Sequence, residues 1–317
     1  MSSDKTKTIT SIGGQALMEG ILMRGPTKTS VAVRLENREI SKEYMKTSCL
    51  RDRYKIFRLP IFRGVGGFID SMKIGYRALA VSAEKAGIEE EDPSKFDQWL
   101  EKILGDKMMK VIMGVASVIG GVLAGLLFFV VPTWLFNISA KSYPSLYDSM
   151  IYRSVFEGIL RILIFLLYII FCSQIKEIKR VFQYHGAEHK TIFCYENEEE
   201  LTVENVRKYK RFHPRCGTSF MIIMLIVGIM IGLFIPFSNA FLRSFIKILC
   251  IPLIVGIGYE LIKICGKYDN FFTRLLAAPG LWMQRITTKE PDDGMIEVAI
   301  AALEDVIPEN GEDKITL

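Results

Sequence analysis

The sequence predicts a polytopic α-helical membrane protein with four transmembrane helices, whose cytoplasmic N- and C-terminal segments form a small α+β part. Half of the 317 residues are hydrophobic and the mean hydropathy is +0.26, although 24% of the residues are charged. No charged residue occurs between Lys110 and Lys141 or between Arg215 and Arg243. Because a membrane span needs about 20 mostly apolar residues, each of these two windows can hold one.

Two further apolar segments carry charges near one end. Residues 154–172 contain Glu157 and Arg161, and residues 247–265 contain Glu260 and Lys263, spaced as pairs along a helix. Pairing or snorkelling lowers the cost of such charges in a membrane. We therefore expect a bundle of four spans within residues 111–265.

The loop charges predict the orientation of these spans. Lys and Arg are concentrated before the first span, in residues 1–110, and in the loop 174–218, whereas the other two loops carry few of them. The positive-inside rule therefore places both termini and the 174–218 loop on the cytoplasmic side. The N-terminus lacks the apolar core of a cleavable signal peptide, and the six scattered cysteines are expected to be free thiols.

The parts outside the spans are expected to be folded. Residues 31–40 alternate apolar and polar side chains around Asn37 and predict a hairpin. Residues 56–83 predict a broken, membrane-associated helix, and residues 271–285 an interfacial anchor. An apolar, acidic tail, residues 296–306, can pack on the hairpin. The expected segments are 1–55 (cytoplasmic motif and hairpin), 56–110 (amphipathic helices and an acidic charged linker, 84–107), 111–265 (bundle with the cytoplasmic loop) and 266–317 (anchor and tail).

All three histidines fall between residues 185 and 213. His185, Glu188 and His189 form H-x-x-E-H, in which a helix places both imidazoles on one face with the carboxylate beside them. His213 and Cys216 follow just before the third span. We expect a zinc site with His185, His189, His213 and Cys216 as candidate ligands and Glu188 as the candidate catalytic base. A structural zinc, or a buried polar cluster without metal, remains an alternative.

Four other residues are candidates for the surroundings of this site. The segment 12–26 holds Gln15, Glu19 and Arg24, which either cap the site or belong to a short amphipathic helix docked on the bundle. Glu260 can reach the site or pair with Lys263. The acidic run 196–200 is expected to be a solvated loop.

Basic residues near the predicted membrane surface suggest partners. Arg207, Lys208, Lys210 and Arg211 cluster in the cytoplasmic loop, where anionic lipid headgroups are the expected contact beside the bilayer itself. A ribosome or a membrane-protein complex is the alternative. The net charge of only +5 gives no reason to expect DNA binding.

Five segments resemble one family. GGQALMEGILMRGP, RLPIFRG, HGAEHKTIFCYE, HPRCGTSF and APGLWMQRITTKEPDDGMIEVAIAAL are similar to the YqhQ-like family of bacterial membrane proteins. The resemblance runs from about residue 9 to residue 306. It implies a multi-pass protein of the bacterial cytoplasmic membrane and a metal-dependent enzyme, with His185, Glu188, His189, His213 and Cys216 in the matching segments.

Three functions are compatible with these features. The first is a metal-dependent hydrolase that acts near the inner leaflet of the membrane. The second is a non-catalytic partner in a membrane assembly, such as a translocon or ribosome complex, in which the metal is structural. A transporter, with the charge pairs of the second and fourth spans lining a path, is the third.

Overall fold

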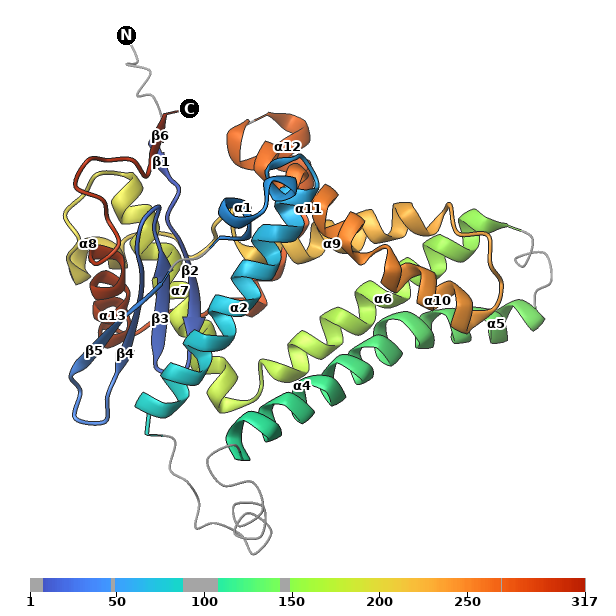
Figure 1. Cartoon of the computed structure of the whole chain (residues 1–317), viewed down its shortest axis with the longest axis horizontal. Helices are drawn as coiled ribbons and strands as arrows, with labels where there is room; N and C mark the ends of the chain where they lie inside the picture. Colours follow the sequence, from blue (N-terminus) through green and yellow to red (C-terminus); the bar gives the residue numbers. More distant parts are fainter. Residues whose placement is uncertain (1–7, 47–48, 88–107, 143–148, 269, 317) are drawn as a thin grey trace, which may run out of the picture. The chain divides into compact units, whose positions relative to one another are not determined.

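The computed structural model describes residues 8–46, 49–87, 108–142, 149–268 and 270–316, which belong to two compact units (Figure 1). Unit 1 draws on residues 1–87, 168–224 and 252–317, and unit 2 on residues 88–167 and 225–251. The described residues are mostly helical, and the strands lie in unit 1. The predicted class, a helical protein with a small α+β part, is confirmed.

Unit 1 is built around an antiparallel sheet of four strands in the order β2-β3-β4-β5. The strands are β2 (Gly13–Leu17), β3 (Gly20–Arg24), β4 (Thr29–Arg34) and β5 (Ile40–Met45). The predicted hairpin is confirmed as β4–β5, although both strands extend beyond residues 31–40. A separate pair joins β1 (Thr8–Thr10) to β6 (Lys314–Thr316).

The N-terminal motif differs from its prediction. Residues 13–24 form the β2–β3 hairpin, so the expected amphipathic helix is wrong. Leu17 pairs with Gly20 across a two-residue turn, in which Glu19 adopts the left-handed conformation with φ of 48°. The first four residues of β3 are buried, and a strand covered on both faces has an apolar run that resembles a helix segment.

Helices cover both faces of this sheet. On one face lie α7 (Lys176–Glu196) and α13 (Asp293–Glu304), whose apolar side chains form a core with Ile21 and Met23. On the other face α2 (Phe62–Lys85) packs through Ile74 and Ala78. The predicted packing of the 296–306 tail on the N-terminal strands is confirmed, with Ile296 at the core.

Shorter helices complete unit 1. They are α1 (Leu50–Arg53), η1 (Lys55–Arg58), α8 (Val203–Arg207) and α12 (Phe271–Thr287). The break predicted in segment 56–83 lies at Pro60 and Ile61, between η1 and α2, where Ile61 has a φ of 68°. The predicted anchor 271–285 is the helix α12, with Phe271, Phe272 and Trp282 exposed. Most of the predicted acidic linker, residues 88–107, lies outside the described residues.

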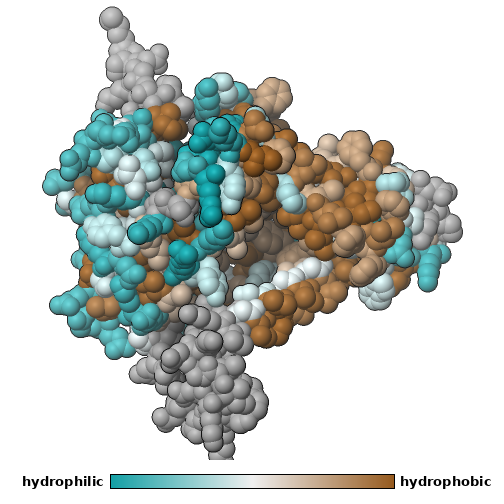
Figure 2. All heavy atoms as spheres, viewed as in Figure 1, coloured by the Kyte–Doolittle hydropathy of each residue, from teal (hydrophilic) through white to brown (hydrophobic). Residues whose placement is uncertain are grey.

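Two helices are long and apolar enough to cross a membrane, Gly114–Ser142 and Met150–Cys172 (α6). The first comprises most of α4 (Met108–Gly125), a π-helical turn (Leu126–Val130) and α5 (Val131–Ser142). Exposed apolar side chains such as Val118 and Leu163 cover these helices, and Figure 2 shows the hydrophobic surface. Association with a membrane is what such a surface indicates.

The third and fourth predicted spans are shorter or broken. The helix α9 (Gly217–Gly232) has 16 residues. The next two helices, α10 (Ala240–Leu249) and α11 (Ile251–Lys267), meet at a bend of 50°. If this bent pair is counted as one span, the described residues contain up to three candidate spans. Pro252 follows the break and lacks the N–H that a continuous helix requires. Among the described residues, four spans are therefore not confirmed.

The predicted charge pairs within the spans are replaced by other pairs. Glu157 accepts hydrogen bonds from Arg153, Arg243 and Lys247, and Arg161 is not among its partners in the described chain. Glu260 pairs with Arg63 of α2, whose guanidinium contacts both carboxylate oxygens. A planar fork suits a carboxylate better than a neighbouring lysine ammonium does.

Candidate functional site

The helix α7 supplies three of the predicted site residues. His185, Glu188 and His189 lie in its buried middle section, between the sheet and the segment that follows α12. Gly186 makes this arrangement possible, because a Cβ there would collide with the carbonyl oxygen of Lys289. The N–H of Lys289 donates to the carbonyl of Phe182 at 2.8 Å, which fastens this segment to α7.

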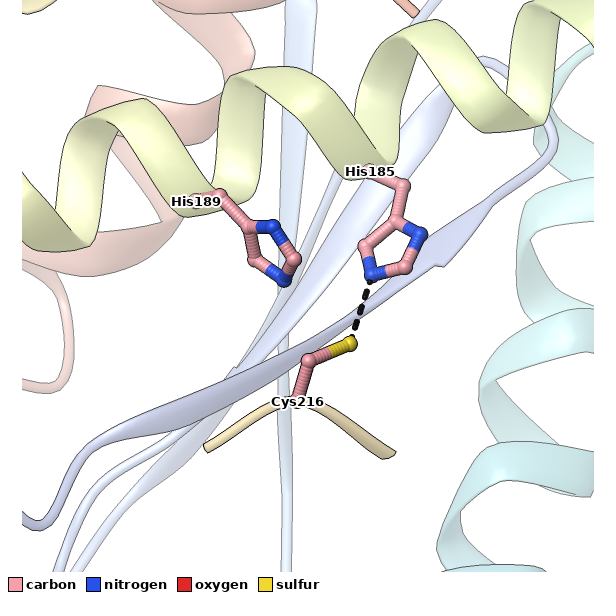
Figure 3. Close-up of side chains that lie close together, drawn as sticks. All are labelled: His185, His189 and Cys216. Atoms are coloured by element: carbon pink, nitrogen blue, oxygen red, sulfur yellow. Dashed lines mark hydrogen bonds between the residues drawn. The ribbon is translucent and has the colours of Figure 1, made fainter. Parts of the chain in front are cut away.

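Three side chains of types that can bind a metal lie close together, two of them on α7 (Figure 3). It consists of His185, His189 and Cys216, with one ligand atom of each within 4.8 Å of the others. His185 Nε2 is 3.1 Å from Cys216 Sγ, and the two imidazole rings are 4.4 Å apart between centroids. We call these three residues the His–Cys cluster.

Both imidazoles are held through their Nδ1 atoms. His185 Nδ1 is 2.9 Å from the carbonyl oxygen of Thr287, and His189 Nδ1 is 2.5 Å from that of Arg211. A carbonyl only accepts, so in the neutral tautomer each Nδ1 carries the proton and each Nε2 has a free lone pair. Burial holds the pKa of His189 below its ordinary value, which keeps the ring neutral as metal binding requires.

Cys216 lies in a turn that other side chains hold in place. The buried amide of Gln284 accepts from the N–H of His213 at 2.7 Å and donates to the carbonyl of His213 at 2.7 Å. Burial alone would raise the pKa of the Cys216 thiol, but His189 and the hydrogen bonds from Thr218 bring it below its ordinary value. A lowered thiol pKa favours the thiolate, which is the form that binds a metal.

Glu188 is buried next to the cluster and is not part of it. Burial raises the pKa of its carboxyl group to about 7, and Cys216 adds to the effect, whereas His185 and a backbone hydrogen bond from Gly14 oppose it. Gly14 of β2 lies against the carboxyl group itself, since a Cβ there would be 2.8 Å from Glu188 Cδ. The group can therefore hold or release a proton near neutral pH.

His213 lies beside the His–Cys cluster and does not join it. Its ring centroid is 5.5 Å from that of His189 and 4.6 Å from that of Phe193, and its Nε2 is 3.7 Å from Glu196 Oε2. Glu196 is buried and also pairs with Arg215, so this member of the acidic run is not solvated as expected. The other glutamates of the run, residues 198–200, are exposed.

The predicted surrounding residues are placed elsewhere in unit 1. Glu19 pairs with Arg180 of α7, while Gln15 packs against Gly75 of α2. Arg24 Nη2 is 3.0 Å from Cys49 Sγ, and Glu260 pairs with Arg63. Gly14 contacts Glu188 instead, and the paired glycines at 13 and 14 are the sequence signal for such a close approach. Gln284, Thr287 and the Arg211 carbonyl carry no comparable signal.

Two of the four basic residues that cluster in the 174–218 loop have acidic partners within the chain. Arg207 pairs with Asp293, and Arg211 pairs with Glu290. Lys208 donates to Asn205 at 3.0 Å. The two ion pairs fasten the loop to Glu290 and to Asp293 at the start of α13, and the predicted contact with lipid headgroups stays a prediction.

Fold and site together define a helical protein with helices long and apolar enough to span a membrane and a small α+β part that carries a His–Cys cluster. A family described as "Protein of unknown function (DUF1385)" matches residues 59–309. The chain is 33% identical over 304 residues to "Uncharacterized protein YqhQ" of Bacillus subtilis (strain 168). The aligned residues make up 96% of this chain and 94% of the relative. The chain belongs to this YqhQ-like family, as its motifs predict. No solved structure matches.

Proposed function

We propose that unit 1 binds one zinc ion through His185 Nε2, His189 Nε2 and Cys216 Sγ, and that the protein is a metal-dependent hydrolase. One observation carries the proposal, namely three ligand atoms within 4.8 Å of one another on side chains that are already oriented. Two imidazoles and a thiolate suit zinc. Atoms bound to one tetrahedral zinc lie roughly 3–4 Å apart, so small side-chain movements suffice.

The number of ligands supports catalysis over a purely structural role. Structural zinc sites have four protein ligands, whereas catalytic sites have three and keep one position open. The cluster has three members among the described residues, because His213 faces Glu196 instead. A zinc ion held there would supply Lewis-acid polarisation of a water molecule or a scissile carbonyl.

Glu188 would carry the proton in this reaction. Its carboxyl group lies next to His185 and Cys216, is shielded by Gly14, and is not committed to an ion pair among the described residues. In its ionised form it would accept a proton from water and then deliver it to the leaving group. His185, the half-buried member of the cluster, marks the side from which a substrate would approach.

The apolar helices support a function at the membrane. We propose a multi-pass protein of the bacterial cytoplasmic membrane with cytoplasmic termini, in which unit 1 acts on a peptide or lipid-linked bond near the inner leaflet. The apolar helices and the excess of Lys and Arg in the N-terminal region and the 174–218 loop support this orientation. A cysteine introduced at the exposed Glu198 should react only with reagents that reach the cytoplasm, and labelling from outside would contradict the orientation.

One observation supports a second candidate, a structural zinc in a partner of a membrane assembly. The ligands join α7 to the turn before α9, and Gln284 of α12 holds the same turn. A metal there would fasten α7 to this turn, which the Gln284 amide in turn joins to α12. Retention of zinc together with full function of a Glu188→Gln variant would favour this candidate.

The first test is the zinc content of the purified full-length protein. We expect about one zinc per chain, lost in His189→Ala and retained in His213→Gln, which changes the neighbouring imidazole outside the cluster. Wild-type protein that has never met a chelator and holds no stoichiometric metal would contradict the proposal. Equal loss in both variants would show that the cluster is not the specific site.

The second test separates catalysis from structure. Glu188→Gln keeps the size of the side chain and removes its proton-transfer capacity. We expect this variant to fold, to retain zinc and to fail to restore function in a strain that lacks the gene. Full restoration by a folded, zinc-loaded Glu188→Gln protein would rule out the hydrolase.

A further inference from the structure

Unit 2 contains a buried cluster of charges with a large positive excess. Its only acidic residue within 108–142, 149–167 and 225–251 is Glu157, which is 1% exposed. Four basic residues are buried with it in unit 2, and each is at most 5% exposed: Arg153, Arg161, Arg243 and Lys247. We call these five residues the basic cluster.

Three of the four cations donate hydrogen bonds to the single carboxylate. Glu157 Oε1 accepts from Arg153 Nε at 3.0 Å, and Oε2 accepts from Arg243 Nε at 3.1 Å and from Lys247 Nζ. Arg243 is further bound by Ser154 Oγ and the carbonyl oxygens of residues 232 and 235. Arg161 is not among the hydrogen-bond donors to Glu157 in the described chain.

Arg161 is buried without a carboxylate partner among the described residues. Its Nε donates to the carbonyl oxygen of Phe128 at 2.7 Å, and its guanidinium lies 5.0 Å from the ring centroid of Phe129. Both residues belong to the π-helical turn, where the irregular backbone makes carbonyl groups available. Arg161 Nη2 is buried with no hydrogen-bond partner in the described chain, and the same holds for Arg153 Nη1.

Such an arrangement is costly in the absence of a ligand. Four cations and one carboxylate leave three uncompensated positive charges inside apolar helices. Charges in this environment are normally paired, and an unsatisfied buried donor adds a desolvation cost of its own. Arg161 and Lys247 also repel each other, which increases the demand for a further negative group.

We propose that the basic cluster binds an oxyanion of the phosphate type, with Arg161 Nη2 as a direct donor and Lys247 as a second cation. A guanidinium presents its donors in a fork that matches the oxygens of phosphate, and a lysine ammonium adds a point charge. The same chemistry is offered by free inorganic phosphate and by the headgroup of a phospholipid. This site is separate from the His–Cys cluster, and its test does not depend on zinc.

Binding is tested on the full chain, purified in a non-ionic detergent and freed of phospholipid. Native mass spectrometry measures adducts with inorganic phosphate in one arm and with phosphatidylglycerol in the other. We expect one adduct per chain in one of the arms, and about tenfold or more weaker binding in Arg161→Met. The matched control is Lys141→Met, which removes an exposed cation from the same unit and should bind like wild type.

The outcomes decide the proposal and the source of the anion. A phosphate adduct that depends on Arg161 identifies a free oxyanion, and a phosphatidylglycerol adduct alone identifies a headgroup. Wild-type protein that binds neither probe, or Arg161→Met that binds as well as wild type, overturns the proposal. If Arg161→Met does not fold, Arg161→Lys takes its place. This variant keeps the positive charge but lacks the forked donors of the guanidinium, so it should still bind the anion several-fold more weakly than wild type.

Discussion

Gly14 of strand β2 lies directly against Glu188 of helix α7, so that a Cβ at residue 14 would be 2.8 Å from Glu188 Cδ and Cγ. We therefore expect Gly14→Ala to displace the carboxyl group or to push β2 away from α7. Overpacking of this kind costs about 1–3 kcal/mol, which thermal unfolding in detergent would detect as a lower Tm.

The neighbouring glycine provides a matched control for this prediction. A Cβ on Gly13 would meet nothing within 4 Å, and neither glycine has a positive φ. Gly13→Ala should therefore leave the Tm close to that of the wild type. Equal effects of the two substitutions would show that the contact with Glu188 does not matter.

A second prediction concerns Gly186 of α7. An added methyl group would collide with the carbonyl oxygen of Lys289, so we expect Gly186→Ala to lower the Tm despite the higher helix propensity of alanine. The shift would also move the nearby Thr287 carbonyl that orients His185. Zinc content should fall together with the Tm. In Gly121→Ala, at an exposed helical position with nothing within 4 Å, both should be preserved.

The ion pair between Glu19 and Arg180 predicts a pH-dependent contribution to stability. The hydrogen bond from Arg180 holds the pKa of Glu19 below its usual value of 4.5. A lowered carboxyl pKa stabilises the folded state above pH 4.5, and this stabilisation is lost as the pH falls through the folded-state pKa. Because Arg180 is 44% exposed, the effect is about 0–1 kcal/mol.

The measurement is the Tm of Glu19→Gln compared with wild type across pH 3–7, a range of roughly two units around an ordinary carboxyl pKa. The difference should be largest near neutral pH and should shrink in acid. A difference that stays constant with pH would mean that the charge of Glu19 is not what stabilises the β2–β3 turn against α7.

Gln284 offers a test of how the Cys216 turn is held. Gln284→Met keeps the volume of the side chain and leaves the buried N–H and carbonyl of His213 without their partner. The expected cost is about 1–3 kcal/mol, with weaker zinc retention during dialysis against a chelator. Gln174→Met, at an exposed position, is the control. Unchanged zinc retention in Gln284→Met would show that the turn keeps its geometry without this amide.

Sequence periodicity predicted the elements whose two faces differ. The hairpin β4–β5 and the two long apolar helices were recognisable, because burial alternates along the hairpin and extends over the whole length of each helix. The tail 296–306 was recognised as apolar but not as the helix α13. Strand β3 is covered on both faces, so its side chains do not alternate between apolar and polar, and the N-terminal motif was misread as a helix. The break at Cys250 precedes Pro252, a local signal that a count of charged residues does not contain.

The sequence predicted which side chains could lie together, and it did not predict the groups that hold them in place. The H-x-x-E-H spacing placed His185 and His189 on one face, and Cys216, one of the two further candidates, lies with them. His213 has the same residue type and lies nearby, but whether it faces the cluster or Glu196 depends on the turn that Gln284 holds. The anchoring carbonyls of Arg211 and Thr287 are backbone groups, which any residue could provide.

The position in the sequence of the carbonyl groups that hold the two imidazoles has a consequence for synthesis of the chain on the ribosome. All three members of the His–Cys cluster have been made once Cys216 is in place, but the carbonyl that orients His185 belongs to Thr287, which is added only after α9, α10 and α11. The sheet partner of β1 arrives later still, at Lys314–Thr316. Unit 1 therefore stays incomplete while residues 225–251 of unit 2 are produced, and a metal captured early would meet an unfinished coordination environment.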